Sequence, residues 1–241
     1  FAVVARRLRD AMMAKGPQPA PEIVSGHAPG GGPSRSPHLA IVPLINAGWP
    51  RASGDLLGLA VVLPRQSSTS GVTAVQQALA TLLKYEPDAS AGRLAVHLFG
   101  DKAWLLERAV APSRASLRPG RWCGASRIWA SVTPVMLDRF PEHGDPVEEA
   151  HLVAEACAAI GLPEPEEVEL HKHSAVTGAP SAYPRHGRGQ PGWAFPKGSK
   201  LKDRPRRHVI LRFNEPVRGP IILGAGRYHG FGLCLPLRGD E

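Results

Sequence analysis

The spacing of apolar residues in the first hundred positions constrains the fold most strongly, because its period changes from segment to segment. Residues 1–15 carry apolar side chains at helical spacing, and residues 38–44 and 56–63 form short apolar runs that are typical of strands. Residues 71–85 return to helical spacing, and residues 94–99 alternate like a strand. The predicted order of helix, strand, strand, helix, strand is that of a ferredoxin-like βαββαβ unit without its first strand.

The absent strand of this unit is expected just upstream of Phe1. The sequence begins there inside a helical pattern and without a methionine, so we expect the chain to be part of a longer polypeptide. Residues 16–37 are rich in Pro, Gly and Ser and are predicted to form an unusually long loop, which makes them a candidate functional segment.

A second unit is predicted after residue 120, with one helix from Pro146 to Gly161 that begins with a proline after Asp145. No second helix of normal length is predicted in it. Its strands are predicted at 129–139, 168–173, 209–213 and 231–237. We therefore expect an α+β fold with two tandem ferredoxin-like (RRM-like) units, residues 1–120 and 121–241.

Positive charge is concentrated in one segment of the chain. The 241 residues carry a net charge of +8, and residues 185–212 alone contain nine Lys or Arg against the single acid Asp203. A neutral body with one basic segment favours a local contact with a polyanion such as nucleic acid. Trp193 and Phe195 lie among these cations, an arrangement suited to stacking on single-stranded bases; the alternative is a solvated loop that the two aromatic rings anchor.

A glycine-rich segment, residues 224–232, lies between two apolar runs near the C-terminus. Its sequence is Gly-Ala-Gly-Arg-Tyr-His-Gly-Phe-Gly. Glycines let a phosphate approach the backbone closely, and successive N–H groups of a turn can form an anion-binding concavity. The alternative is a tight connection that needs glycine only for its backbone dihedrals.

Metal binding and disulfide bonds are not predicted. His171 and His173 share one face of a predicted strand, but no carboxylate or cysteine is spaced to complete a metal site with them. Three cysteines in apolar contexts, Cys123, Cys157 and Cys234, are expected to be core thiols in a reducing compartment. No apolar run approaches the ~18 residues of a membrane span, so a cytoplasmic protein without membrane contact is expected.

The pattern Gly-x-Gly-x-x-x-Gly-x-Gly before the last predicted strand resembles the C-terminal glycine-rich loop of the CRISPR-associated RAMP superfamily. Further blocks are similar to the repeat-processing endoribonuclease portion of the type I-G (formerly I-U) fused backbone-subunit and processing-endonuclease protein. These blocks are residues 25–27, 38–44, 57–65, 126–134, 161–163 and 216–220.

The resemblance implies a metal-independent endoribonuclease, without a cofactor, that cleaves CRISPR repeat transcripts to mature crRNA. The 2'-OH would be the nucleophile, and the products would carry a 2',3'-cyclic phosphate and a 5'-OH. The partners implied are repeat RNA or crRNA and the other subunits of a type I crRNA-guided surveillance complex. The alternative is a non-catalytic RNA-binding or assembly subunit of the same complex.

The resemblance also implies the site residues. Relatives place a histidine in or just after the first helix, which corresponds here to His27, and His38 is the second candidate and possible partner. Histidine suits both proton-transfer roles near neutral pH. The residues expected to bind RNA come from the basic segment and the glycine-rich segment: Trp193, Lys197, Lys200, Lys202, Arg204, Arg206, Arg207, Gly224, Gly226, Arg227, Tyr228, Gly230 and Gly232.

Overall fold

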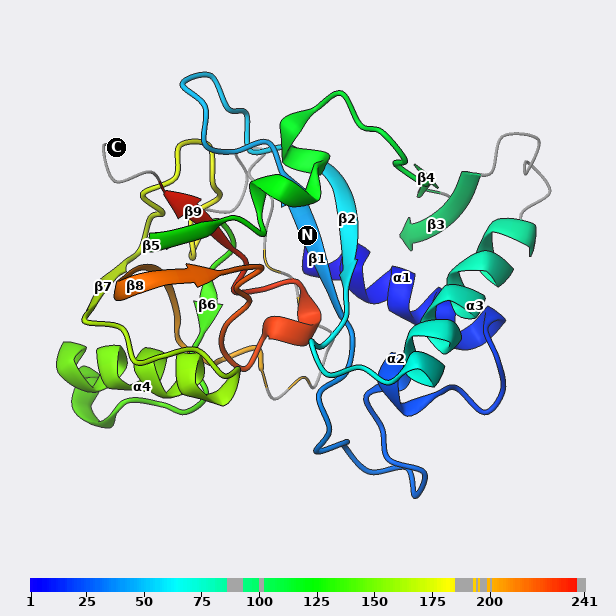
Figure 1. Cartoon of the computed structure of the whole chain (residues 1–241), viewed down its shortest axis with the longest axis horizontal. Helices are drawn as coiled ribbons and strands as arrows, with labels where there is room; N and C mark the ends of the chain where they lie inside the picture. Colours follow the sequence, from blue (N-terminus) through cyan, green and yellow to red (C-terminus); the bar gives the residue numbers. More distant parts are fainter. Residues whose placement is uncertain are drawn as a thin grey trace.

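The protein has an α+β fold in which helices pack beside antiparallel sheets (Figure 1). The computed structural model describes residues 1–85, 93–99, 102–184, 193, 195, 199 and 201–237. Within these residues no helix is both long and apolar enough to cross a membrane.

The first half of the chain follows the predicted order of elements. β1 and β2 pair antiparallel, with Ala40 opposite Val62, and β3 and β4 form a separate two-stranded sheet. The strand β4 was not predicted, although Gly-Asp between two apolar runs is a recognised hairpin signal. The elements are α1 (Ala2–Lys15), α2 (Glu22–Ser25), β1 (Ala40–Ile45), β2 (Leu56–Val62), α3 (Thr69–Tyr85), β3 (Arg93–Phe99) and β4 (Lys102–Glu107).

The second half forms a five-stranded antiparallel sheet with a helix on one face (Figure 1). The sheet order is β6-β8-β5-β9, and β7 pairs with β8. As predicted, α4 begins with Pro146, and the Asp145 carboxylate accepts a hydrogen bond from the Val147 N–H (2.9 Å). The elements are β5 (Ala125–Ser131), β6 (Val135–Met136), α4 (Pro146–Ala159), β7 (Glu167–His171), β8 (Arg206–Arg218) and β9 (Cys234–Leu237).

Two predicted boundaries in this half are wrong. The strand expected at 129–139 is divided into β5 and β6, and β8 begins at Arg206, so residues 206–212 are strand and not part of a basic loop. The strand order β7-β8-β5-β9 is the one expected for a ferredoxin-like unit, and α4 is the one long helix among the described residues of this half; the 3₁₀ turn η5 (Arg227–His229) lies between β8 and β9, where such a unit would have its second helix. The ferredoxin-like description of both units remains a prediction.

The two halves share part of the hydrophobic core. One cluster combines Ala40, Val42 and Leu44 of β1 with Leu233 and Leu235 near the C-terminus. The β1 strand is therefore covered by residues from the opposite end of the chain. Cys157 and Cys234 are buried thiols, as predicted, and burial raises the pKa of both.

Candidate active site

The glycine-rich segment forms a tight loop around the turn η5. A Cβ atom at Gly224 would collide with the carbonyl oxygen of Met136, and one at Gly232 with the carbonyl oxygen of Leu223; both glycines have positive φ, 78° and 74°. Only glycine fits such positions. Gly226 and Gly230 are buried as well.

A Cβ atom at any of the four glycines would contact other parts of the protein, so the glycines shape the loop. Their direct contact with RNA stays a prediction. The side chains that the loop offers to a ligand are those of Arg227, Tyr228 and His229, none of which is fully buried.

The loop brings Tyr228 against His38, although the two residues are 190 positions apart in the sequence. Their rings stack with centroids 3.6 Å apart and planes inclined by 24°. The Arg227 guanidinium lies 4.6 Å from the centroid of the Tyr228 ring and donates a hydrogen bond to the Gly224 carbonyl (3.2 Å). A histidine of the first half and a cation of the second half therefore meet beside the start of β1.

Arg9 connects the three elements that form this junction. It extends from α1, and its Nη2 donates to the carbonyl of Leu39, next to β1 (2.7 Å), and to the carbonyl of Tyr228, in η5 (3.0 Å). One guanidinium therefore fixes the glycine-rich loop relative to the residue that follows His38.

The surroundings of His38 keep its imidazole neutral. Burial lowers the pKa of His38 to about 4, although a hydrogen bond to the Ser36 carbonyl raises it, and the charges of Arg9, Arg227 and His229 lower it further. The pKa of His229 is also lowered, by desolvation and then by Arg9 and Arg6, even though part of its side chain is exposed to solvent. Both imidazoles are therefore mostly unprotonated at neutral pH.

His27 lies on the folded loop that ends at His38. Its ring is exposed, and its Nδ1 is 3.0 Å from the Ser25 carbonyl oxygen. The preceding residue, Gly26, has φ of 71°, and a Cβ there would lie 2.7 Å from Nε2 of His38. The backbone beside His27 therefore touches the His38 ring, and both predicted histidines belong to one region.

Comparison with protein families identifies the family. Residues 3–236 match the model of the CRISPR-associated protein, GSU0054 family. The chain belongs to this family. Its membership supports a role in CRISPR-Cas systems together with CRISPR RNA and other Cas proteins. Comparisons with curated proteins and with solved structures gave no significant match.

The described part of the basic segment contributes further cations, of which Arg204 lies close enough to Asp138 to act on it together with Arg227. Lys202 is exposed, and Arg204 donates to the Leu137 carbonyl (3.2 Å). The guanidinium of Arg206 lies 4.8 Å from the ring centroid of Tyr183. Lys197 and Lys200, which were also predicted to bind RNA, lie outside the described residues.

Two members of the predicted RNA-binding set have structural positions instead. Trp193 is 6% exposed, and its ring packs against Phe1 and Phe231, so it cannot offer a face to bases. The Arg207 guanidinium donates two hydrogen bonds (2.6 and 2.7 Å) to the buried carboxylate of Glu149. Removing Arg207 would leave that carboxylate buried without its partner, which is costly to stability.

Three residues of the site were missed by the sequence reading: Arg9, Asp138 and His229. Arg9 lies four residues after Ala5 and three before Met12, both buried, so a cation on the apolar stripe of the first helix was the available signal. Burial raises the pKa of Asp138, whereas the charges of Arg227 and Arg204 lower it. His229 lies inside the glycine-rich segment 224–232, which was itself a signal, whereas the sequence around Asp138 carries none.

Proposed function

We propose that this chain is a metal-independent endoribonuclease that cleaves CRISPR repeat transcripts and stays bound to the crRNA in a type I interference complex. The observation that carries the proposal is the neutral imidazole of His38, stacked on Tyr228 among the cations Arg9 and Arg227. Membership in a CRISPR-associated family supports CRISPR RNA as the substrate. The resemblance to the type I-G processing endonuclease supports the class of reaction.

In the proposed reaction, His38 acts as the general base. Its neutral imidazole accepts the proton of the 2'-OH, whose oxygen attacks the adjacent phosphorus while the bond from phosphorus to the 5'-oxygen breaks. The products are a 2',3'-cyclic phosphate and a 5'-hydroxyl. The positive charge of Arg227 stabilises the negative charge that develops on the phosphorane oxygens.

His27 is proposed as the second proton-transfer residue, which donates a proton to the leaving 5'-oxygen. It lies on the loop that folds against His38, and imidazole serves as an acid as well as a base near neutral pH. Because His27 is exposed, RNA can reach it directly.

The test uses end-labelled repeat RNA and the complete protein in EDTA. We expect cleavage at one position, an upstream fragment whose terminal phosphate resists phosphatase until acid opens the ring, and no cleavage of RNA with a single 2'-deoxy substitution before the scissile phosphate. Dependence on Mg²⁺ would overturn the mechanism. Tight binding with no cleavage would favour a non-catalytic RNA-binding subunit.

A further inference from the structure

The connection between β1 and β2, residues 46–55, holds an exposed tryptophan on a fixed loop. The Asn46 N–H donates to the Asp55 carbonyl (2.8 Å), and the Gly54 N–H donates to the Asn46 carbonyl (3.0 Å). The Gly48 N–H donates to the carbonyl of Thr177 in the second half of the chain (2.8 Å). Since the loop is held at its base and at its side, Trp49 is presented with little loss of entropy on binding.

The exposure of Trp49 is unusual for this protein. Its side chain is 39% exposed, whereas the other four tryptophans are buried or half-buried. The Arg121 guanidinium lies 4.0 Å from the centroid of the indole ring, and its Nη2 donates to the Ala47 carbonyl (3.0 Å). Arg121 thus fixes the ring from one side and leaves the remaining indole surface accessible.

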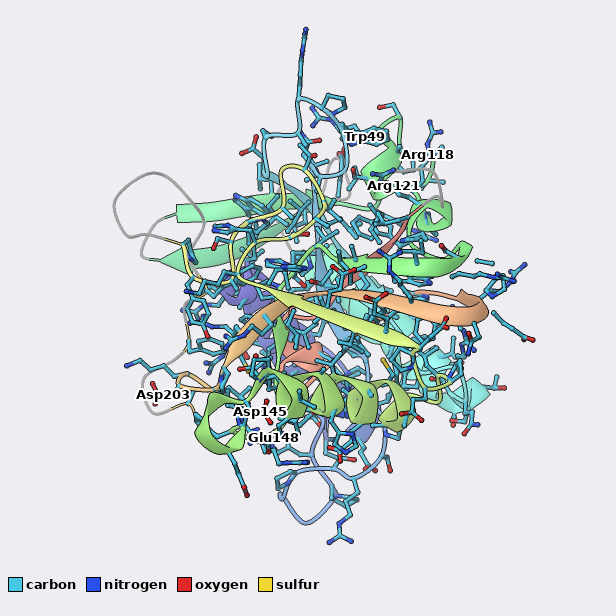
Figure 2. All side chains as sticks on the ribbon, turned by 90° about the vertical axis from the view of Figure 1, so that its left-hand side faces the viewer. Trp49, Arg118, Arg121, Asp145, Glu148 and Asp203 are labelled. Atoms are coloured by element: carbon cyan, nitrogen blue, oxygen red, sulfur yellow. The ribbon has the colours of Figure 1, made fainter. Side chains whose placement is uncertain are left out.

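Charge around Trp49 is predominantly positive. The two segments that meet here, residues 46–55 and 112–124, contain four arginines, which are Arg51, Arg114, Arg118 and Arg121, and one acid, Asp55. Figure 2 shows Trp49, Arg118 and Arg121 together at one end of the molecule, while the labelled acids Asp145, Glu148 and Asp203 lie toward the other end. Arg51, Arg114 and Arg118 are exposed.

The orientation of Arg118 is fixed without neutralising its charge. Its Nε donates to the Pro112 carbonyl (2.9 Å) and its Nη2 to the Ser113 carbonyl (3.0 Å). Asp55 accepts a hydrogen bond from the Ser53 hydroxyl (2.6 Å). The corner therefore presents an aromatic surface beside oriented cations.

We infer that this corner, defined as Trp49 with Arg51, Arg118 and Arg121, is a second RNA contact, in which one unpaired base stacks on Trp49 and phosphates contact the arginines. An aromatic face combined with cations is the arrangement that binds single-stranded nucleic acid. RNA is favoured over a protein partner because the two segments around Trp49 carry four arginines against one acid, which suits the phosphate backbone of a nucleic acid. The inference rests on the proposed function only in taking RNA as the ligand.

The corner contacts a different part of the RNA from the candidate active site. His38 lies two residues before β1 and Trp49 lies four residues after it. A six-residue strand spans about 20 Å. A single strand that is cut beside His38 is therefore held at a second point, several nucleotides away.

The experiment measures binding of single-stranded repeat RNA that carries the blocking 2'-deoxy substitution, so cleavage does not enter the result. Trp49→Ala is expected to raise Kd about 5- to 150-fold, the size of one lost stacking contact. Trp49→Phe, which keeps an aromatic face, is expected to retain most of the affinity. The matched control is Phe140→Ala, since Phe140 is 60% exposed on the other half of the molecule.

The possible outcomes distinguish failure of the RNA contact from failure of the proposed reaction. Equal Kd values for Trp49→Ala and Phe140→Ala would overturn the inference, and so would a Trp49 variant that weakens only the binding of a protein subunit. If Trp49→Ala fails to fold, as seen in its thermal unfolding, Trp49→Leu, which keeps an apolar side chain without an aromatic face, gives the same test. Binding that depends on Trp49 in a protein without nuclease activity would refute the proposed reaction and leave the RNA contact intact.

Discussion

The two ends of β1 combine an aromatic ring with a nitrogen-containing side chain in different ways. Before the strand, the ring of Tyr228 stacks on the imidazole of His38, which is neutral at pH 7 because its pKa is lowered to about 4. After the strand, the guanidinium of Arg121 lies over the ring of Trp49, and this guanidinium keeps its charge at any physiological pH.

Because of this difference, we expect the His38 end of β1 to take part in the cleavage reaction and the Trp49 end to hold the RNA. A general base must be able to gain and lose a proton, and burial of His38, with a smaller contribution from the charges of Arg9 and Arg227, keeps its imidazole in the neutral form that can accept one. A permanent cation cannot transfer protons in this way, but it attracts phosphate equally well over the whole pH range. We therefore expect substitutions at the two ends to affect different measurements.

The largest effect is expected from His38→Ala. Loss of the general base should reduce the single-turnover cleavage rate about 10²- to 10⁴-fold, while Kd for RNA changes little, since the lost group is uncharged at pH 7. His27→Ala is the matched variant, and its effect measures the contribution of the second histidine. A His38→Ala protein that cleaves at the normal rate would contradict the proposal that His38 is the general base.

The next largest effect is expected from Arg9→Ala. Loss of the two hydrogen bonds to Leu39 and Tyr228 frees the glycine-rich loop, and such misplacement should lower the cleavage rate about 10- to 100-fold. Because the charge of Arg9 lowers the pKa of His38 in addition to burial, which is the larger cause, the acidic limb of the pH–rate profile should also move upward from about pH 4, by part of the full shift. Arg9→Lys retains a charge and should lower the rate with a smaller shift of that limb. An unchanged limb in Arg9→Ala would show that Arg9 has only a structural role.

Acid sensitivity of folding is expected to be moderate, with His38 among its causes. The pKa of His38 is lower in the folded state than the ordinary value of 6.5, so the unfolded chain binds more protons between pH 6.5 and about 4. The free energy of unfolding should therefore fall as the pH falls through this range. The lowered pKa values of His208 and His229 act in the same direction. Urea denaturation at several pH values should show a weaker pH dependence for His38→Gln, and an identical slope would contradict the pKa shift.

Much of the fold followed from local patterns in the sequence, because apolar periodicity and the Asp145-Pro146 start of α4 are local signals. The predicted helix in residues 1–15 and the strands near 38–44 and 56–63 were confirmed. The end of the basic segment was predicted to be loop because Arg206 and Arg207 are charged. Both residues lie in β8, where the charge of Arg207 is paired with Glu149.

The site was predictable only in parts. The sequence indicated His38 and the glycine-rich segment separately, but it could not show that His38 meets Tyr228, since that contact depends on how two halves of the chain pack. The surroundings of Trp193 depend on tertiary packing in the same way. Its cationic neighbours in sequence suggested RNA, whereas its neighbours in space are Phe1 and Phe231.

The smallest effect, and the one that separates the two ends of β1 most directly, is expected in the salt dependence of RNA binding. Each arginine that contacts a phosphate contributes about 0.7 to the slope of log K against log salt for a single strand. Replacing Arg51 and Arg118 by Gln should therefore reduce the slope by about 1.4 at pH 5.5 and equally at pH 8, because both guanidinium groups are charged throughout. His38→Ala should leave the slope unchanged at both pH values, because an imidazole with its pKa near 4 carries little charge at either. A slope that depends on His38 at pH 5.5 would mean that the histidine is charged there, and the two ends of β1 would then both hold RNA by charge.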